Sequence, residues 1–383
     1  MDAHTAVIGV GTMGSMALWQ LARQGIPVLG IEQFEVGHEL SASGGESRIF
    51  RTAYVEGPSY IPLLQRSLEL WRELEAEADE HLLTLTGGLT IGPPDSHAVS
   101  QALAGCKNHD LTHEVLDNDA LRRSYPQHLV GPEDIAVLDP AAGVLRPERA
   151  ILAATRAARA RGARIVSQTR VTRLEPVADG VRIHADDRSW VTERVIVTVG
   201  PWAAQLMPRL YERIVPHRLH LAWHPVAEPA AYAPSRHPVF LRETPSGLVF
   251  GFPCIDGATV KTGLHETMAD FAPSERVDDP DALKRRADGA AIRALGCSLA
   301  TYLSGLDPVP TRVSTYMDGY TPSGDPVIAP WPESSGSWVL GGFSGHGFKM
   351  APAIGQLASE LVTDTASSMT RRFLASPAGS AAG

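Results

Sequence analysis

Three glycines close to the N-terminus constrain the fold more than any other feature of this chain. Gly9, Gly11 and Gly14 form a Gly-x-Gly-x-x-Gly pattern between an apolar stretch at residues 5–10 and a helical pattern at residues 15–24. Glycines at this spacing permit a tight turn between a strand and a helix, and they let the two elements pack closely. The N-terminal part is therefore predicted to be a strand–turn–helix unit of an α/β fold.

The residues that follow extend this unit into a β-α-β motif. A second apolar stretch at residues 26–31 ends at Glu32. Gly11 would let the backbone approach a pyrophosphate, and the N-terminus of the following helix favours such an anion. Glu32 stands where a carboxylate can accept a hydrogen bond from a ribose hydroxyl. We predict a dinucleotide site, and these residues alone leave open whether it takes FAD or NAD.

Two later features favour FAD. Residues 195–200 form a buried type of strand that ends in Gly200 after a predicted hairpin, as occurs where flavin domains pass near the dinucleotide. Residues 342–349 read Gly-Phe-Ser-Gly-His-Gly-Phe-Lys and precede an apolar helix at residues 353–362. A helix N-terminus in that place suits the negative charge of a reduced flavin.

The length and the pattern of strands indicate two domains. A chain of 383 residues exceeds one ordinary hydrophobic core. Short alternating strands between residues 216 and 310 are typical of a large antiparallel sheet. We predict an α/β chain (α+β overall) with a Rossmann-type FAD-binding domain and an antiparallel-sheet substrate domain. The FAD-binding domain is expected at residues 1–82, 146–215 and 311–383, and the substrate domain at residues 83–145 and 216–310.

Composition narrows the partners and the compartment. The formal net charge of −9 opposes nucleic acid and anionic membrane surfaces. Cys106, Cys254 and Cys297 form neither a disulfide framework nor a zinc spacing, so no metal is expected. No apolar run approaches the ~20 residues of a membrane helix, and no secretion signal precedes the first strand. We predict a cytoplasmic, soluble protein whose Ala/Ser/Gly-rich C-terminal tail is disordered.

Several motifs together resemble one family. Residues 47–51 (Ser-Arg-Ile-Phe-Arg), Tyr54, residues 260–265 (Val-Lys-Thr-Gly-Leu-His) and the loop at residues 342–349 are similar to the monomeric sarcosine oxidase and N-methyltryptophan oxidase family of FAD-dependent amine oxidases. The resemblance covers most of the chain. It implies a monomer that oxidises a secondary (N-methyl) amino acid such as sarcosine to an imine and reduces O2 to H2O2.

The resemblance also implies roles for individual residues. Arg51 and Lys349 match the pair that holds the substrate carboxylate, and a guanidinium fork with a lysine charge suits that group. Arg48 matches a cation beside the flavin. Because Arg48, Arg51 and Tyr54 are three residues apart, a helical turn would place them on one side. Tyr54 and Tyr316 are expected to line the substrate pocket.

Further matches concern oxygen and the cofactor. Lys261 matches a lysine near the flavin that promotes electron transfer to O2, where a fixed cation stabilises developing superoxide. Strand alternation would place Lys261, Gly263 and His265 on one face. His265 and His346 match histidines of the pocket. The other residues expected to contact the cofactor are Thr12, Met13, Gln33, Ser43, Ser47, Val171, Trp202, Gly342, Gly345, Gly347 and Phe348.

The chain departs from the family at several positions. Ser314 stands where the family usually has the cysteine that bonds to the flavin, and a serine hydroxyl is too weak a nucleophile to replace a thiolate. FAD is therefore expected to bind without a covalent link. Gly44 and Gly45 replace polar residues beside the flavin, and Val249-Phe250 stands where a tyrosine is usual. Residues 320–326 are more similar to the turn of glycine-oxidase-type relatives.

These departures leave alternatives for the reaction. One is an oxidase of a larger or cyclic amino acid, similar to pipecolate or N-methyltryptophan. Another is an aromatic hydroxylase with the same FAD fold, which would need NAD(P)H. A third is a flavin-binding protein without turnover, in which amino acids would never bleach the flavin.

Overall fold

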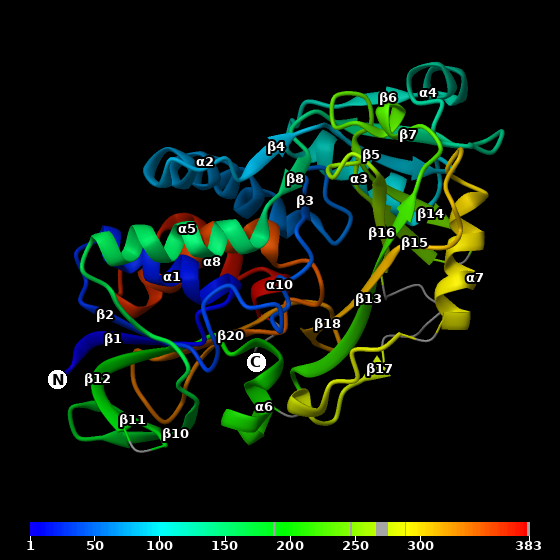
Figure 1. The fold of residues 1–383 in the computed structure, drawn as a ribbon. Helices are drawn as coiled ribbons and strands as arrows, with labels where there is room; N and C mark the ends of the chain where they lie inside the picture. Colours follow the sequence, from blue (N-terminus) through cyan, green and yellow to red (C-terminus); the bar gives the residue numbers. More distant parts are fainter. Residues whose placement is uncertain (187, 211, 246, 266–274, 288, 381–383) are drawn as a thin grey trace.

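The computed structural model describes residues 1–383 with the exception of residues 187, 211, 246, 266–274, 288 and 381–383 (Figure 1). Its strands form two large sheets and one small sheet. In Figure 1 the first large sheet and its helices lie to the left, and the second large sheet lies to the right. This arrangement confirms the predicted fold class.

The first sheet contains the N-terminal β-α-β unit. Strand order along the sheet is β10-β11-β12-β1-β2-β9, and β20 pairs with β12 and β19. The pairs around β1 and between β12 and β20 are parallel, whereas β10, β11 and β12 form an antiparallel hairpin ribbon. The strands are β1 (Ala3–Ile8), β2 (Val28–Ile31), β9 (Arg164–Val166), β10 (Val171–Val177), β11 (Gly180–Ala185), β12 (Arg188–Val197), β19 (Val327–Pro330) and β20 (Trp338–Gly341).

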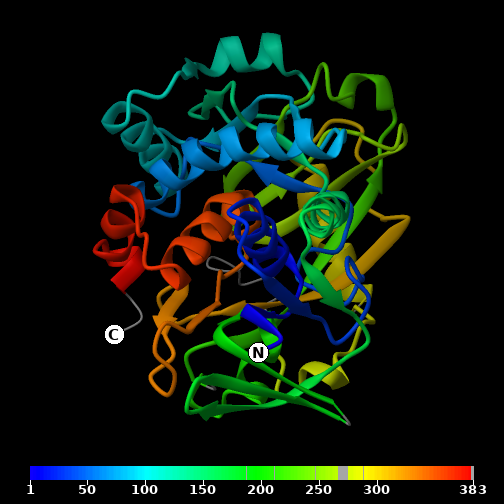
Figure 2. The ribbon, with the colours of Figure 1, turned by 90° about the vertical axis from the view of Figure 1, so that its left-hand side faces the viewer.

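Four helices pack together over one face of this sheet (Figures 1 and 2). They are α1 (Thr12–Arg23), α2 (Ile61–Ala78), α5 (Pro147–Ala160) and α8 (Ala351–Val362), and α2 lies on the outer side of α5 and α8. Their apolar faces meet in the largest hydrophobic core, where Trp19 of α1 and Trp71 of α2 are fully buried. Burial of each large apolar side chain stabilises the folded state by about 1.5–3 kcal/mol relative to leaving it exposed to water. Helix α8, from the C-terminal part of the chain, thus packs against α1 of the N-terminal unit.

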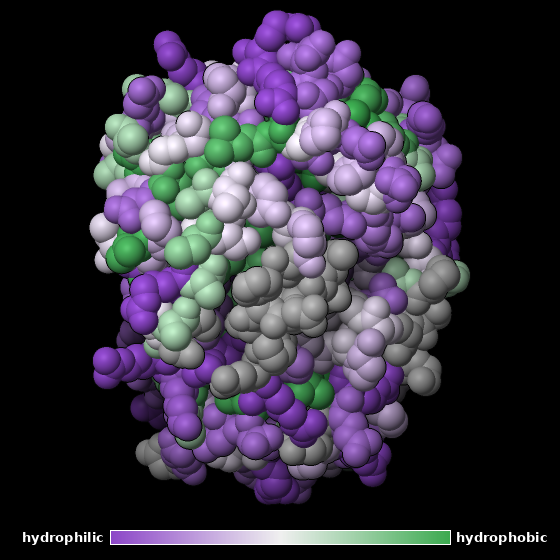
Figure 3. Space-filling model, turned by 90° about the vertical axis from the view of Figure 1, so that its right-hand side faces the viewer, coloured by the Kyte–Doolittle hydropathy of each residue, from purple (hydrophilic) through white to green (hydrophobic). Residues whose placement is uncertain are grey.

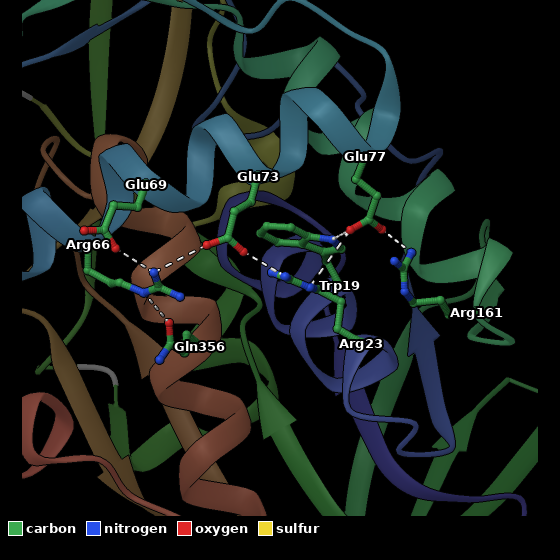
Figure 4. A network of polar contacts seen from close by, with 8 residues as sticks. All are labelled: Trp19, Arg23, Arg66, Glu69, Glu73, Glu77, Arg161 and Gln356. Atoms are coloured by element: carbon green, nitrogen blue, oxygen red, sulfur yellow. Dashed lines mark hydrogen bonds and ion pairs between the residues drawn. The ribbon is translucent and has the colours of Figure 1, made fainter.

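A line of charged side chains crosses the outer surface of these helices (Figure 4). Arg23 Nη2 lies 2.7 Å from Glu73 Oε2, and Glu77 accepts a hydrogen bond of 3.1 Å from the Trp19 indole. Arg66 connects α2 to Gln356 of α8 through a hydrogen bond of 2.9 Å. Since these pairs are partly exposed, each adds little stability.

The second sheet has nine strands in the order β17-β13-β16-β15-β14-β5-β7-β6, with β18 paired to β13. Only the β14–β5 pair is parallel among the described strands of this sheet. The sheet expected within residues 216–310 is thus present, and strands from outside that range extend it. The strands are β5 (Gly88–Gly92), β6 (Glu114–Leu116), β7 (Ile135–Asp139), β13 (Val215–Pro225), β14 (Val239–Thr244), β15 (Gly247–Gly251), β16 (Thr259–His265), β17 (Glu275–Arg276) and β18 (Arg312–Tyr320).

The remaining helices flank the second sheet or connect elements. The α-helices are α3 (His97–Asn108), α4 (Asn118–Ser124), α6 (Ala203–Leu206) and α7 (Gly289–Ala300). Helix α7 lies in a region for which the sequence indicated only strands. The 3-10 turns are Pro58–Tyr60, Gly200–Trp202, Pro208–Leu210, Pro229–Tyr232, Pro280–Ala282 and Phe348–Met350. The chain returns from the second sheet to the first between β18 and β19, and the domain boundaries stay a prediction.

Arg48 and the residues after it form a strand rather than a helical turn. Strand β3 (Arg48–Phe50) pairs with β8 (Gly143–Leu145), which also pairs with β4 (Leu83–Leu85). The expectation that a helical turn carries Arg48, Arg51 and Tyr54 is therefore wrong. The physical reason is that the β3 backbone hydrogen bonds go to a partner more than ninety residues away, which the local spacing of three does not reveal.

The prediction of a disordered C-terminal tail is also wrong for the residues that the structure describes. Helices α9 (Ser368–Leu374) and α10 (Pro377–Ser380) follow α8, and both are drawn in red in Figure 2. Phe373 and Ala378 are buried in the large core. Apolar contacts with the helical layer thus order a segment whose small polar composition is typical of flexible tails.

The face drawn in Figure 3 has a band of hydrophobic side chains across its upper half, with hydrophilic regions above and below. Among the residues that the structure describes, no helix combines the length and the apolar character needed to cross a bilayer.

Candidate functional site

One large cavity is lined by residues of both large sheets and of the C-terminal loop. It brings together segments from opposite ends of the chain, from Ile8 to Lys349. Of the predicted site residues, those that line it are Gly9, Gly11, Thr12, Met13, Glu32, Gln33, Ser47, Arg48, Arg51, Val171, Gly200, Trp202, Lys261, Gly342, Gly345, His346, Gly347, Phe348 and Lys349.

The first end of the cavity is formed by the turn into α1. Gly9 has a φ of +88°, a conformation that favours glycine. A Cβ on Gly14 would lie 1.9 Å from the carbonyl oxygen of Gly9, so helix and strand pack too closely for a side chain. A Cβ on Gly11 would meet no protein atom within 4 Å. Gly11 is therefore not required by packing, and its position facing the cavity leaves room for a ligand.

The N-terminus of α1 fits a pyrophosphate. Gly11 is the N-cap residue and provides no side-chain hydrogen bond to the first turn of the helix. Thr12 and Met13 in that turn line the cavity. The exposed N–H groups and the helix dipole favour an anion at this place.

Glu32 lies beside this turn and is held by backbone groups. Its Oε2 accepts a hydrogen bond of 2.7 Å from Val10 N–H, and its Oε1 accepts one of 3.0 Å from Phe34 N–H. Burial raises the pKa of the carboxyl, whereas these N–H groups lower it. His38, which the sequence did not suggest, lies 3.6 Å from Glu32 Oε1, and burial lowers the pKa of its imidazole to about 4. His38 is therefore neutral at pH 7, and Glu32 keeps acceptor capacity for a ribose hydroxyl.

The other end of the cavity contains four cations. The first, Arg48, donates hydrogen bonds to the carbonyl oxygens of Ser47, Ala42 and Gly44, at 2.8, 2.7 and 2.6 Å. The loop before β3 thus wraps around the guanidinium. Since all three acceptors are neutral carbonyl groups, these hydrogen bonds leave the positive charge of Arg48 uncancelled.

Lys261 in β16 is the second cation and is almost fully buried. Its Nζ donates to Gly45 O at 2.8 Å and Ser47 O at 2.7 Å, and it lies 2.8 Å from Ser47 Oγ. The ring of Phe252 lies 4.3 Å from the ammonium group. Burial, followed by the charge of Arg48, lowers the pKa of Lys261 well below its ordinary value. The lysine is thus held as a desolvated donor at the cavity wall.

Arg51 and Lys349 are the third and fourth cations and share one aromatic ring. Arg51 Cζ lies 4.8 Å and Lys349 Nζ 5.2 Å from the centre of the Tyr54 ring. Arg51 Nη2 forms a 2.5 Å ion pair with Glu56 Oε1. Arg51 Nη1 is buried and finds no hydrogen-bond acceptor among the described residues. Lys349 Nζ donates to His346 O at 2.9 Å, and burial lowers its pKa to about 7.

His346 fixes the orientation of Tyr54. Its Nε2 lies 3.0 Å from the carbonyl oxygen of Gly324, which can only accept a hydrogen bond. Nε2 therefore carries the proton, and Nδ1 accepts from the Tyr54 hydroxyl at 2.7 Å. Tyr54 lies beneath Arg51 and Lys349 and is not among the residues that line the cavity. It supports the cations, which differs from the expected role as a wall of the pocket.

Tyr316, Gly14 and Ser43 are likewise absent from the cavity lining among the described residues. The ring of Tyr316 packs against the loop before β3, where a Cβ on Gly44 would lie 2.2 Å from its Cε1. This close packing explains why Gly44 has no side chain. Gly14 lies under the turn, and Ser43 is buried in the loop and bonds to Ser41. The side chain of His265 lies outside the described part of the structure.

Two carboxylates of the cavity were missed by sequence reasoning. Glu56 pairs with Arg51, and Asp318 in β18 accepts a hydrogen bond of 3.1 Å from Gly345 N–H of the glycine-rich loop. A single acidic residue in a loop or strand is usually solvated, so neither position gives a local signal. The five-residue separation between Arg51 and Glu56 was the only available hint.

The three cysteines and Ser314 lie away from the cavity wall. Cys106 and Cys254 are buried, Cys297 is exposed, and none of them lines the cavity. Ser314 is half-buried in β18 and is also not among the lining residues. Among the described residues, no group of three or more His, Cys, Asp or Glu side chains could hold a metal ion.

Comparison with known proteins identifies the dinucleotide. Residues 4–361 match the family described as FAD dependent oxidoreductase. The chain is 34% identical over 358 residues to the monomeric sarcosine oxidase of Streptomyces avermitilis, covering 93% of this chain and 92% of that one. It is 31% identical over 372 residues to the N-methyl-L-tryptophan oxidase of Yersinia pestis, covering 95% and 96%. The resemblance drawn from the motifs is thereby confirmed.

A solved structure confirms the fold. NikD, described as an unusual amino acid oxidase essential for nikkomycin biosynthesis, superposes with a TM-score of 0.81 at 24% identity. The alignment covers 96% of this chain and 95% of NikD. The family match spans the glycine turn, both large sheets and α8, and the uncapped helix end beside Glu32 suits the dinucleotide. This chain therefore belongs to the FAD dependent oxidoreductase family.

Proposed function

We propose that the protein oxidises the secondary amine of an N-methyl amino acid such as sarcosine to an imine, with O2 reduced to H2O2. The observation that carries this proposal is the group of Arg51, Lys349 and Glu56, in which two buried cations face a single carboxylate. A substrate carboxylate would supply the second negative charge. The names of the two curated relatives support the same substrate class.

The hydrogen-bond geometry of Arg51 supports this role. One nitrogen, Nη2, is bound to Glu56, whereas the buried Nη1 has no acceptor among the described residues. A buried donor without a partner costs about 1–3 kcal/mol. A substrate carboxylate that accepts a hydrogen bond from Nη1 would remove this cost. If the substrate carboxylate also replaced Glu56 at Nη2, both of its oxygens would bind the guanidinium group.

Lys349 adds a charge that depends on pH. Because burial lowers its pKa to about 7, only part of the protein carries the ammonium form at neutral pH. An arriving carboxylate would favour the charged form, since an opposite charge nearby stabilises it. Arg51 and Lys349 together would hold the substrate by one end and orient its amine, which is catalysis by positioning.

The reaction is balanced by two electrons. The amine loses two electrons and two protons to become the imine, which water then hydrolyses. FAD, when bound, supplies the chemistry that accepts these electrons and passes them on to O2. O2 takes up two electrons and two protons to become H2O2. In its ammonium form Lys261 would stabilise the negative charge that develops on O2, because a buried cation acts strongly in a medium of low dielectric constant, and the developing charge itself favours that form.

We further propose that FAD is bound without a covalent link. Two observations support this: Ser314 is not a lining residue, and no cysteine lines the cavity among the described residues. Acid precipitation of the purified protein should leave the yellow flavin in the supernatant. Flavin that stays with the pellet would contradict the proposal.

A second candidate substrate class is a larger or cyclic secondary amino acid. The cavity wall contributed by the second sheet is largely apolar, which suits a hydrophobic part on the substrate. The apolar lining residues on this side are Leu219, Leu221, Leu241, Phe250, Phe252 and Leu264. A small molecule such as sarcosine would leave much of this wall without contacts.

An anaerobic spectrum of the FAD-loaded protein tests these proposals. Sarcosine, N-methyl-L-tryptophan and L-pipecolate would be added separately, and bleaching of the visible flavin band identifies the substrate class. Air should then restore the colour and produce H2O2. If dithionite bleaches the flavin but no amino acid does, the protein is a flavin binder or acts outside this class.

Variants connect the result to the carboxylate site. Arg51→Gln should raise the substrate concentration for half-maximal bleaching by at least about tenfold, which corresponds to about 1.4 kcal/mol. Arg149→Gln provides the matched control, because Arg149 is an exposed arginine of α5 paired with Glu80. If both variants need the same substrate concentration for half-maximal bleaching, Arg51 does not bind the substrate.

A further inference from the structure

Three carboxylates line the cavity among the described residues: Glu32, Glu56 and Asp318. Glu32 lies at the dinucleotide end, and Glu56 is paired with Arg51. Asp318 lies on β18 of the second sheet, and neither the dinucleotide site nor the substrate carboxylate site uses it. A half-buried acid at the wall of this cavity needs its own explanation.

Asp318 binds the glycine-rich loop directly. Its Oδ2 accepts a hydrogen bond of 3.1 Å from Gly345 N–H, and its Oδ1 accepts one of 2.7 Å from Gly319 N–H. Gly345 has a φ of +79°, and a Cβ there would lie 2.6 Å from the Tyr320 hydroxyl. Ser344 N–H donates to Gly319 O at 3.0 Å. The loop is thus docked on β18, and the Gly345 N–H is directed at the carboxyl group of Asp318.

The surrounding charges decide when this carboxyl is ionised. Arg48 from β3 is the cation that acts on it, and His346 and Lys349 lie on the loop side. His217 is opposite Asp318 on β13, and burial lowers the pKa of His217. Burial raises the pKa of Asp318 to about 6, although the two N–H groups and Arg48 lower it. The carboxylate is therefore charged at pH 8 and mostly neutral at pH 5.

We propose that Asp318 sets the redox potential of the bound flavin. Its carboxylate places a negative charge at the cation end of the cavity, where it accepts the hydrogen bond of Gly345 N–H and interacts with the charge of Arg48. The dinucleotide end is located at α1, so the flavin ring of FAD belongs toward the end that contains Arg48, Lys261 and Asp318. Two electrons and one proton convert an oxidised flavin into its anionic reduced form. A carboxylate in the same wall disfavours that anion and also takes up a donor that could stabilise it.

The consequence is a potential that is lower when Asp318 is charged. Reduction would also draw a proton onto Asp318, because a new negative charge nearby raises the pKa of a carboxyl. The potential of the wild-type protein should therefore fall more steeply with pH above about pH 6 than the flavin alone requires. The effect needs no amine substrate, so its test is independent of the proposed amine oxidation.

The test is a potentiometric titration of Asp318→Asn with dithionite, monitored by the flavin absorbance. At about pH 8 the ratio of reduced to oxidised flavin at a given potential should rise at least tenfold, which is about 30 mV for a two-electron couple. At about pH 5 the two proteins should differ by less than about twofold, since the wild-type carboxyl is then protonated. Asp318→Glu should restore most of the wild-type behaviour.

Two controls keep the outcome decisive. Asp364→Asn removes an exposed carboxylate that pairs with Arg194 and should leave the potential unchanged. If Asp318→Asn fails to retain FAD, the wild-type curve of potential against pH still tests the proposal through its change of slope near pH 6. Equal potentials of wild type and Asp318→Asn at about pH 8, or a wild-type curve without that change of slope, would overturn it.

Discussion

The two ends of the cavity are built in opposite ways. The dinucleotide end is centred on residues 9–38 and depends on backbone geometry, with Gly9, Gly14 and the start of α1 as its main parts. The cation end collects Arg48, Lys261 and Lys349 from separate segments of the chain. The first end is thus a local motif, whereas the second exists only after both sheets and the C-terminal loop have packed together.

The energetic requirements of the two ends also differ. The glycine turn is satisfied by the fold alone, because its strand and helix pack closely without a ligand. The cation end holds desolvated charges, and burial lowers the pKa of both Lys261 and Lys349. Desolvated cations without full pairing are costly, so this end is arranged for ligands and reacting groups that carry negative charge.

The largest expected effect separates packing from binding within the glycine turn. Gly14→Ala places a Cβ against the Gly9 carbonyl and should destabilise the protein by more than about 2 kcal/mol and abolish FAD retention. Gly11→Ala should keep the stability of the apoprotein within about 0.5 kcal/mol and still weaken FAD binding at least tenfold. Denaturant melts of the apoproteins and fluorescence titration with FAD measure both. A strongly destabilised Gly11→Ala apoprotein would show that packing alone requires this glycine.

The next effect concerns Lys261. Lys261→Met should leave flavin reduction by substrate largely intact and slow reoxidation by O2 by about 10²–10³-fold, as for loss of a preorganised charge-stabilising donor. Stopped-flow mixing of the reduced protein with O2 measures the rate. Lys107→Met on α3 is the control, since Lys107 does not line the cavity. Unchanged reoxidation would exclude Lys261 from the oxygen reaction.

A smaller effect is the pH dependence of carboxylate binding. Lys349 has a pKa lowered to about 7, so its positive charge is present below pH 7 and is lost above it. Affinity for a non-oxidisable carboxylate such as propionate should therefore fall up to about tenfold between pH 6 and pH 8. In Lys349→Met the affinity should be lower and nearly constant over this range. Perturbation of the flavin spectrum reports the binding, and an equal pH dependence in both proteins would contradict the assignment.

The smallest effect is the coupling free energy between Tyr316 and Gly44 of the loop before β3. Gly44→Ala should cost about 1–3 kcal/mol, because its Cβ would overlap the Tyr316 ring. In combination with Tyr316→Ala this overlap is absent, so the double variant should be more stable than the sum of the single effects by about 1 kcal/mol. Urea unfolding of the four apoproteins gives the coupling free energy. Additive effects would mean that the two residues do not constrain each other.

Local sequence was a good guide where the structure is local. The predicted β-α-β unit corresponds to β1, α1 and β2, and Glu32 lies where the spacing placed it. The helical spacing of Arg48, Arg51 and Tyr54 misled, because β3 pairs with β8 from a distant part of the chain. The predicted disorder of the C-terminal tail was wrong for a similar reason, because Phe373 packs against helices that are distant in sequence.

The sequence by itself determined the glycine turn, the family and the cations that the cavity would contain. Short spacing encodes the glycine turn because the turn depends on neighbours in the chain, whereas the family and the cations were inferred from the resemblance of the motifs. The tertiary structure alone decided that Glu56 neutralises part of Arg51 and that Asp318 faces the glycine-rich loop. A carboxylate becomes functional when its surroundings remove water and place donors or charges beside it, and those surroundings come from segments that are far apart in sequence.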